Sequence, residues 1–275
     1  MSIRLISTDF DGTLVGHPSD GRCVPELAAA LQTAKDLGVL WAINTGRSVE
    51  HTLEGLEELR APVQPDFLLT HERELYHFDG GRWVAFGEWN EVCRARHAAL
   101  FHETGEILEQ VRSIVATMPD VRMINEDGHL AGLIGFDEEA MDRVTEKLAA
   151  LSQTYPDFSW QRNTIYLRFC HRAYNKGTVL GELSRLTKIG PAEILAAGDH
   201  FNDLSMLDGR FAKHPACPGN AIKEVKETVA RAGGFVSQHP CGKGVAEAIS
   251  RGISAGNKTG GHAFTRPPVG NANLA

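Results

Sequence analysis

The sequence lacks any uninterrupted apolar stretch of roughly 18 residues, the length at which a run becomes a candidate membrane span. We therefore expect no membrane-embedded segment. The segment from Met1 to Asp9 also lacks the apolar core of a secretory signal peptide. Together these absences predict a cytoplasmic protein without a membrane partner.

Cysteine is scarce and scattered. Only 5 of the 275 residues are cysteine, and no two of them form a C-x-x-C pair. An odd number of widely spaced cysteines argues against a disulfide framework and against a cysteine zinc site. We interpret all of them as reduced thiols that pack as small hydrophobes. They are Cys23, Cys93, Cys170, Cys217 and Cys241.

Positive charge is in deficit. The chain carries 28 lysines and arginines against 35 aspartates and glutamates, which gives a formal net charge of -7. This balance argues against a nucleic-acid partner and against a polybasic membrane-binding surface. An anionic ligand must then be held by a local basic site, and a small molecule is the expected partner. The oligomeric state stays open.

The first quarter of the chain contains a regular alternation of strand-like and helix-like segments. Pro25 predicts the start of a helix that stops at Gly38, and Ser48 predicts the cap of a second helix that runs to Leu59. Short apolar runs between these helices predict buried strands. The predicted strands are residues 3–7, 39–43 and 66–70. This order is typical of an α/β fold with a parallel sheet and helices on its faces.

The pattern changes at about residue 79. Asp79–Gly81 suits a hairpin turn, and a long helical stretch is predicted from about Glu91 to Met118. Mixed strands and another helix follow, which is typical of an α+β lobe inserted into the first domain. The glycine-, asparagine- and proline-rich end of the chain is predicted to be disordered. The predicted division is 1–78 with 172–255 for the core, 79–171 for the inserted lobe and 256–275 for the tail.

Polar side chains follow the predicted strands where each strand ends, or begin a helix. Open parallel sheets bind ligands beyond the carboxyl ends of their strands, so we expect these side chains to converge. Several carboxylates in one partly buried cleft repel one another, and a divalent cation with oxygen ligands is the simplest compensation. The sequence therefore predicts a Mg²⁺ site. The converging residues are Asp9, Asp11, Thr45, Lys176, Asp199 and Asp203.

The spacing of Asp9 and Asp11 allows the two carboxylates separate roles. Residues two apart in an extended chain point the same way, and a turn at the following glycine can tilt the second one. One carboxylate can attack phosphorus and form an acyl phosphate while its neighbour handles a proton. Thr45 offers a hydroxyl and Gly46 an amide to the phosphate oxygens, and Lys176 can neutralise their charge.

Four motifs follow one another along the chain: Asp9-Phe10-Asp11-Gly12-Thr13-Leu14, Asn44-Thr45-Gly46-Arg47, Asn175-Lys176-Gly177 and Gly198-Asp199-His200-Phe201-Asn202-Asp203. In this order they resemble the motifs of the haloacid dehalogenase-like (HAD) phosphatase superfamily. The Thr-Gly-Arg form of the second motif and the late insertion resemble the Cof-type branch, which carries an α+β cap of class IIB. The resemblance covers about residues 3–252. It implies a doubly wound, Rossmann-like parallel-sheet core with an inserted cap that sets substrate specificity.

The resemblance also implies an activity and a role for individual residues. The implied activity is Mg²⁺-dependent hydrolysis of a phosphomonoester, most often a sugar phosphate, through an aspartyl-phosphate intermediate. Asp9 corresponds to the nucleophile and Asp11 to the general acid and base. The remaining implied residues are Asp9, Asp11 (through its carbonyl), Asp199 and Asp203 for the metal, Thr45, Gly46, Lys176 and Asn202 for the phosphate, and Arg47 for the substrate.

Some alternatives stay open at this point. A sugar hydroxyl rather than water could accept the phosphoryl group in a phosphotransferase or mutase, and a metabolite-binding module without turnover would keep the same fold.

Arg47 suits an ion pair that locks its loop nearly as well as a substrate contact. The segment His71–Arg73 replaces the Ser-Asn-Gly of many Cof-type sequences, and we interpret it as a salt-linked turn. Tyr166 and Arg168 share a strand face that could bind the leaving group, whose identity the sequence leaves open.

Overall fold

The computed structural model describes residues 2–16, 23–103, 105–126 and 129–257. The chain divides into two compact units. The first contains the described residues up to Asn90 and from Lys176 onward, and the second is Glu91–Asn175. Among the described residues, no helix combines the length and the apolar character that crossing a bilayer requires.

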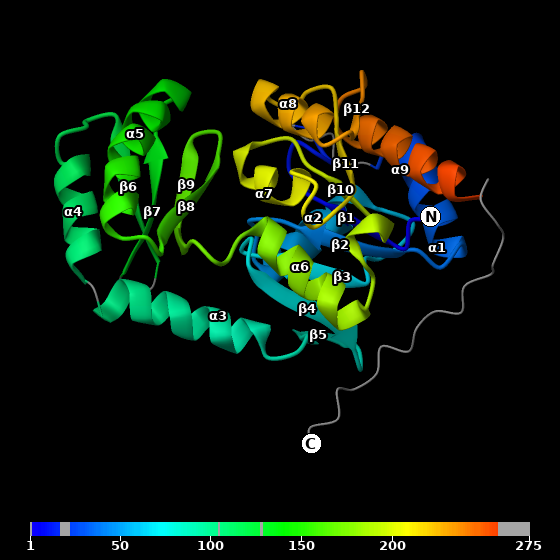
Figure 1. The fold of residues 1–275 in the computed structure, drawn as a ribbon, viewed down its shortest axis with the longest axis horizontal. Helices are drawn as coiled ribbons and strands as arrows, with labels where there is room; N and C mark the ends of the chain where they lie inside the picture. The colour runs from blue at the N-terminus through cyan, green and yellow to red at the C-terminus, as the bar shows by residue number, and fades with distance from the viewer. Residues whose placement is uncertain (1, 17–22, 104, 127–128, 258–275) are drawn as a thin grey trace. The chain divides into compact units, whose positions relative to one another are not determined.

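An eight-stranded sheet forms the centre of the first unit (Figure 1). Its strand order is β12-β11-β10-β1-β2-β3-β4-β5, and the strands from β12 to β3 are parallel. Every residue of β1, β2, β3 and β10 is buried, as expected for parallel strands that are covered on both faces. The strands are β1 Leu5–Thr8, β2 Leu40–Asn44, β3 Phe67–Thr70, β4 Glu74–Asp79, β5 Arg82–Ala85, β10 Ile194–Ala197, β11 His214–Cys217 and β12 Phe235–Val236.

Helices cover both faces of this sheet (Figure 1). Helices α1, α2 and α9 pack on one face, and α6, α7 and α8 pack on the other. Successive strand residues alternate between the two cores, so Ile6 lies in the first and Leu5 in the second. This arrangement confirms the predicted doubly wound α/β core. The helices are α1 Pro25–Asp36, α2 Val49–Leu59, α6 Lys176–Thr187, α7 Leu204–Leu207, α8 Lys223–Arg231 and α9 Cys241–Asn257, with short helices η2 Pro191–Glu193 and η3 Phe201–Asp203.

The local signals for the first two helices are confirmed. Helix α1 begins at Pro25, and Gly38 follows its end with a φ of 75° that favours glycine. Helix α2 is capped by Ser48, whose hydroxyl accepts the backbone N–H of His51 at 3.2 Å. Helix α1 connects the neighbouring parallel strands β1 and β2, and helix α2 connects β2 and β3.

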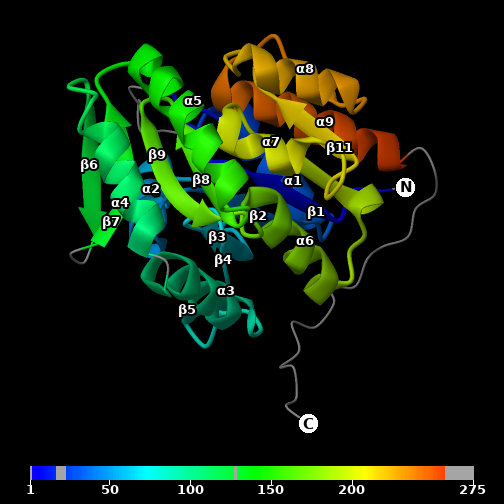
Figure 2. The ribbon, with the colours of Figure 1, turned by 60° about the vertical axis from the view of Figure 1, so that its left-hand side comes forward.

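The second unit contains a four-stranded antiparallel sheet of order β6-β7-β9-β8 (Figure 2). Helices α4 and α5 pack on one face of it and enclose a separate apolar core that includes Val111, Leu148 and Leu167. This is an α+β arrangement, as the sequence predicts. The elements are α3 Trp89–Ala98, the π-helical turn η1 Ala99–Glu103, α4 Gly105–Val115, β6 Val121–Glu126, β7 His129–Gly135, α5 Glu138–Thr154, β8 Phe158–Asn163 and β9 Tyr166–His171.

The structure differs from the expected boundaries in three places. The hairpin at residues 79–81 joins β4 and β5, which extend the core sheet, so the first unit continues beyond residue 78. The side chain of Asn90 donates to and accepts from the backbone of Leu75, which anchors the end of this extension. The second unit continues to Asn175, beyond the predicted limit at residue 171, and the predicted helical stretch corresponds to α3, η1 and α4. Helix α9 runs to Asn257, so most of the predicted tail lies outside the described residues.

Candidate active site

The carboxyl ends of β1, β2, β3 and β10 meet at one edge of the core sheet because these strands are parallel neighbours. Asp9 directly follows β1, Thr45 follows β2, and Asp199 lies just beyond β10. These residues are therefore gathered at the edge where open α/β sheets bind ligands. The first step of the sequence argument, that the polar strand ends converge, agrees with this topology.

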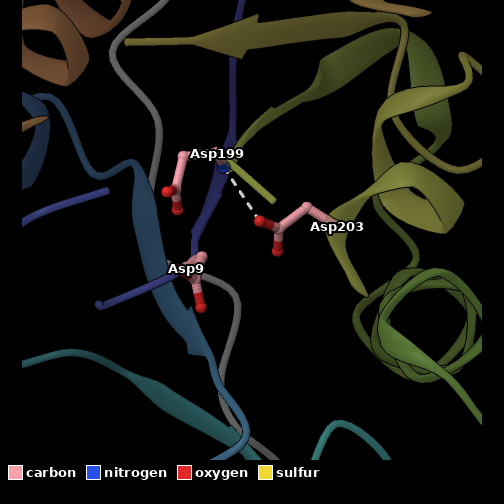
Figure 3. Close-up of side chains that lie close together, drawn as sticks. All are labelled: Asp9, Asp199 and Asp203. Carbon is pink, nitrogen blue, oxygen red and sulfur yellow. Dashed lines mark hydrogen bonds between the residues drawn. The ribbon is translucent and has the colours of Figure 1, made fainter. Parts of the chain in front are cut away.

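Three aspartates form a compact acidic cluster there. One carboxylate oxygen from each of Asp9, Asp199 and Asp203 lies within 4.8 Å of the others, and all three side chains are buried. Figure 3 shows the three side chains close together, with a dashed line for the hydrogen bond from the Asp199 backbone to Asp203. Asp203 also organises the loop, because its Oδ2 accepts the backbone N–H groups of Asp199 at 2.8 Å and His200 at 2.9 Å.

Lys176 supplies positive charge to this cluster. It is the first residue of α6, and its side chain is completely buried. Its Nζ donates to Asp9 Oδ1 at 2.6 Å and to Asp203 Oδ1 at 2.7 Å. Burial alone would lower the pKa of the Lys176 ammonium, but the charges of Asp203 and Asp9 outweigh it and hold that pKa above its ordinary value. The lysine therefore stays charged.

The cluster still carries an excess of buried negative charge. Burial, followed by the charges of the neighbouring aspartates, raises the pKa of Asp9 well above its ordinary value despite Lys176. The same two causes raise the pKa of Asp199 to about 7. A divalent cation such as Mg²⁺ prefers hard oxygen ligands, and its charge would offset the repulsion between these converging carboxylates. The residues present thus fit a magnesium ion held by Asp9, Asp199 and Asp203.

The loop after β1 is shaped around Asp199. Thr13 Oγ1 donates to Asp199 Oδ1 at 2.8 Å. Gly12 has a φ of 81°, and a β-carbon there would collide with the Asp199 carboxylate, so only glycine fits. The side chain of Asn220, which lies just beyond β11, donates to the carbonyl of Gly12 at 2.8 Å. These contacts fix the Asp-x-Asp-Gly-Thr loop against the acidic cluster.

Asp11 is held by Arg47. The guanidinium donates from Nε to Asp11 Oδ2 at 2.7 Å and from its terminal nitrogen to Asp11 Oδ1 at 2.6 Å. It also lies over the ring of Phe10, with Cζ 4.5 Å from the ring centroid. A bidentate contact fixes both the position and the plane of a carboxylate. The loop-locking ion pair that the sequence left open is therefore present, and a substrate contact by Arg47 stays a prediction.

Thr45 and Gly46 form a turn braced by the loop after β3. The backbone N–H of Thr45 donates to the carbonyl of Leu69 at 2.8 Å, and the N–H of Glu72 donates to the carbonyl of Thr45 at 2.9 Å. The Thr45 hydroxyl accepts the N–H of Arg47 at 3.2 Å and keeps its own proton to donate. The turn lies at the same carboxyl edge of the sheet as the acidic cluster. Hydrogen-bond donors of the turn are therefore placed at the edge where a phosphate would bind.

Glu72 is turned into this site rather than into a surface salt link. Its side chain is buried, and Oε1 accepts the side-chain N–H of Asn202 at 2.6 Å. Burial raises the pKa of the Glu72 carboxyl, against the opposing charge of Lys176. The Glu72 carboxylate thus has an amide partner inside the fold, and the interpretation of His71–Arg73 as a salt-linked turn stays a prediction.

Sequence reasoning overlooked Thr13 as a partner of Asp199 and did not select Glu72 or Asn220. All three have a recognisable signal, because each is a polar residue just beyond the carboxyl end of a strand of the parallel sheet. Tyr166 and Arg168 belong to β9 of the second unit, where Tyr166 is exposed. Their contact with a substrate stays a prediction.

Two family models together match most of the chain. Residues 64–249 match the family model described as haloacid dehalogenase-like hydrolase, and residues 2–122 match the one described as sucrose-6F-phosphate phosphohydrolase. A mannosylfructose-phosphate phosphatase of Agrobacterium fabrum is 26% identical over 230 residues, which are 81% of this chain and 86% of that protein. A glucosylglycerol-phosphate synthase of Pseudomonas anguilliseptica is 26% identical over 75% of this chain, which spans only 25% of the synthase.

A solved structure has the same fold. It is the sucrose-phosphatase from Synechocystis sp. PCC6803 in complex with sucrose and phosphate, and it superposes with a TM-score of 0.68 at 19% identity. The match covers 92% of this chain and 98% of that one. Both units of the chain therefore fall within a fold that has been seen in a phosphatase.

Proposed function

Because this chain belongs to the family of haloacid dehalogenase-like hydrolases, we propose that it is a Mg²⁺-dependent phosphatase that acts through a phosphorylated Asp9. The observation that carries the proposal is the pairing of Asp9 with buried Lys176 inside the acidic cluster. A carboxylate is a weak nucleophile, and it captures a phosphoryl group only where positive charge offsets the charge of that group.

The phosphoryl group binds at the carboxyl ends of the parallel strands. The Thr45 hydroxyl and the Gly46 amide donate to its oxygens, and Asn202 donates from its side chain. Lys176 holds Asp9 Oδ1 at 2.6 Å, which leaves Oδ2 to attack. Two unit charges about 4 Å apart attract by about 4 kcal/mol at an effective dielectric constant of 20, so Lys176 contributes appreciably to phosphate binding.

The reaction proceeds in two displacements at phosphorus. Asp9 forms a bond to phosphorus while the bond to the leaving oxygen breaks, and Asp11 gives its proton to that oxygen. Asp11 then takes a proton from a water molecule, whose oxygen attacks phosphorus and releases Asp9 and inorganic phosphate. Arg47 keeps the Asp11 carboxyl in one orientation through both steps.

Asp9, Asp199 and Asp203 would hold the Mg²⁺ ion, together with the backbone carbonyl of Asp11. When bound, the ion supplies positive charge that screens the carboxylates from one another and from the phosphate. The Thr13 hydroxyl donates to the Asp199 carboxylate, and the backbone N–H groups of Asp199 and His200 donate to the Asp203 carboxylate. Both carboxylates are therefore held in place without the ion. The donor set is thus organised by the chain itself.

The substrate is a small phosphorylated metabolite, and a sugar phosphate is favoured. Support comes from the names of two relatives, a mannosylfructose-phosphate phosphatase and a sucrose-phosphatase, and from the match of residues 2–122 to a sucrose-6F-phosphate phosphohydrolase model. A net charge of -7 also disfavours substrates with several further anionic groups.

The test is a hydrolysis screen of purified protein with Mg²⁺ and with EDTA. The panel contains sugar phosphates, nucleotides, phosphoglycolate and pyridoxal phosphate, with and without an added alcohol as acceptor. We expect Mg²⁺-dependent phosphate release from at least one sugar phosphate, and no release by Asp9→Asn. Transfer to the alcohol in place of hydrolysis would identify a phosphotransferase, and silence across the panel would favour a binding module.

A further inference from the structure

Glu72 is a buried acid that the mechanism above does not use. Its side chain belongs to the loop after β3, and only 6% of the residue is exposed. A glutamate is rarely buried unless it is paired, and Glu72 accepts a hydrogen bond from the side chain of Asn202, which lies 130 residues further along the chain. The structure therefore brings Glu72 directly against one of the residues assigned to the phosphate.

The backbone at this point is strained. His71 has a φ of 51° and Glu72 a φ of 63°, in the left-handed region that glycine adopts freely and a side chain with a β-carbon does not. Strain of this kind persists only where the surroundings hold the residue in place, and it clusters at functional sites. A carboxylate thus stands at a position whose backbone favours glycine.

Glu72 connects two loops that follow different strands. Its backbone N–H donates to the carbonyl of Thr45 at 2.9 Å, and its Oε1 accepts from Asn202 Nδ2 at 2.6 Å. Oε1 also lies against Gly46, where an added β-carbon would be only 3.3 Å away. The residue therefore bridges the Thr45–Gly46 turn and the Asn202 side chain.

This bridge decides which way the Asn202 carboxamide faces. An ionised carboxylate only accepts hydrogen bonds, so it must face the nitrogen of the carboxamide and not its oxygen. Asn202 is 4% exposed, and its Oδ1 is buried without a hydrogen-bond partner among the described residues. The carboxamide is planar, so once one N–H is held the direction of the other is fixed as well.

We propose that Glu72 is a positioning residue for phosphate recognition, which holds one N–H of Asn202 so that the other is directed at a phosphoryl group bound at Thr45, Gly46 and Lys176. The inference rests on the proposed function and goes beyond it, because it assigns the buried Glu72 side chain a role in ground-state binding. A donor to the non-bridging oxygens contacts them both before and during transfer, so its loss affects KM more than kcat.

Three variants separate the roles of the side chain. Glu72→Gly removes the carboxylate and relieves the backbone strain, whereas Glu72→Gln keeps an acceptor for Asn202 at the same place. His71→Gly is the matched control, because it relieves left-handed strain at the adjacent residue and leaves Glu72 intact. Asn202→Ala and the double variant Glu72→Gly/Asn202→Ala complete a double-mutant cycle. Thermal unfolding checks that each variant is folded.

The measured quantities are KM and kcat for the substrate from the screen, and the affinity for inorganic phosphate by calorimetry in Mg²⁺. We expect Glu72→Gly to raise KM and the phosphate Kd roughly tenfold or more, with kcat within about threefold of wild type. Glu72→Gln and His71→Gly should stay within about threefold of wild type in all three quantities. The KM and the phosphate Kd of the double variant should be no higher than those of Asn202→Ala.

The inference is overturned alone if wild type hydrolyses and binds phosphate but Glu72→Gly does so equally well. It is also overturned if Glu72→Gln is as impaired as Glu72→Gly, or if the two losses in the double variant add. A wild type that neither hydrolyses phosphate esters nor binds phosphate overturns the proposed function and this inference together.

Discussion

Replacing Lys176 by methionine should strongly destabilise the metal-free protein. The lysine Nζ lies 2.6 Å from Asp9 Oδ1 and 2.7 Å from Asp203 Oδ1, and none of the three side chains is more than 5% exposed. Methionine has a similar length and no charge. The substitution therefore removes the charge, keeps most of the packing and leaves two buried carboxylates next to each other.

The expected loss can be worked from these contacts. Removal of one partner from a buried ion pair costs about 3–5 kcal/mol, because the remaining charge is left buried and uncompensated. The raised pKa of Asp9 limits the loss, since protonation of that carboxyl relieves part of the repulsion. For a chain of this length, such a change corresponds to a decrease in Tm of about 10 °C.

The assay is thermal unfolding in EDTA at pH 8, followed by circular dichroism. The matched control is Lys243→Met, because Lys243 pairs with Glu26 at 3.4 Å on the surface and both side chains are about half exposed. The control should melt close to wild type. A Lys176→Met protein that melts within about 2 °C of wild type would refute the buried ion-pair argument.

Three further outcomes follow from the same geometry. The pKa of Asp199 is raised to about 7 from 3.8, so its contribution to stability is present at low pH and is lost as pH rises through about 7. The Tm in EDTA should therefore fall between pH 5.5 and 8, with the largest gain from added Mg²⁺ at pH 8, and a Tm that rises over this range would contradict the shift. Arg47→Ala should lower kcat/KM for a sugar phosphate about tenfold or more but lower kcat/KM for p-nitrophenyl phosphate much less, because kcat/KM reports the first displacement and that leaving group needs no proton from Asp11; equal losses in kcat/KM would remove Arg47 from this role. Asp9→Asn should leave the Tm near or above that of wild type in EDTA and reduce turnover at least 100-fold, and activity above that level would contradict the nucleophile assignment.

Much of the fold follows from local sequence signals. Pro25 and Ser48 mark real helix starts, and the alternation of short apolar runs with amphipathic helices gives the doubly wound sheet. The resemblance drawn from four motifs is confirmed by the family match over residues 64–249. These features succeed because each depends on residues close together in the sequence, or on the rule that parallel strands share one carboxyl edge.

The partners of the site residues could not be predicted in the same way. Arg47 pairs with Asp11 across 36 positions and Glu72 pairs with Asn202 across 130, so neither contact has a local pattern. The boundary of the first unit at Asn90 could not be predicted from a local pattern either. A hairpin after the third strand can begin an insertion or extend the sheet, and here the side chain of Asn90 ties it to the sheet through Leu75.

The central claim is that Asp9 captures the phosphoryl group, and a trapping experiment tests it most directly. In Asp11→Asn the first displacement of p-nitrophenyl phosphate needs no acid, whereas hydrolysis of the phosphorylated enzyme lacks its base. Rapid acid quenching and peptide mass spectrometry should then find one added phosphoryl group on the peptide that contains Asp9, in Mg²⁺ but not in EDTA. A phosphoryl group on another residue, or its absence while p-nitrophenol is released, would contradict the account.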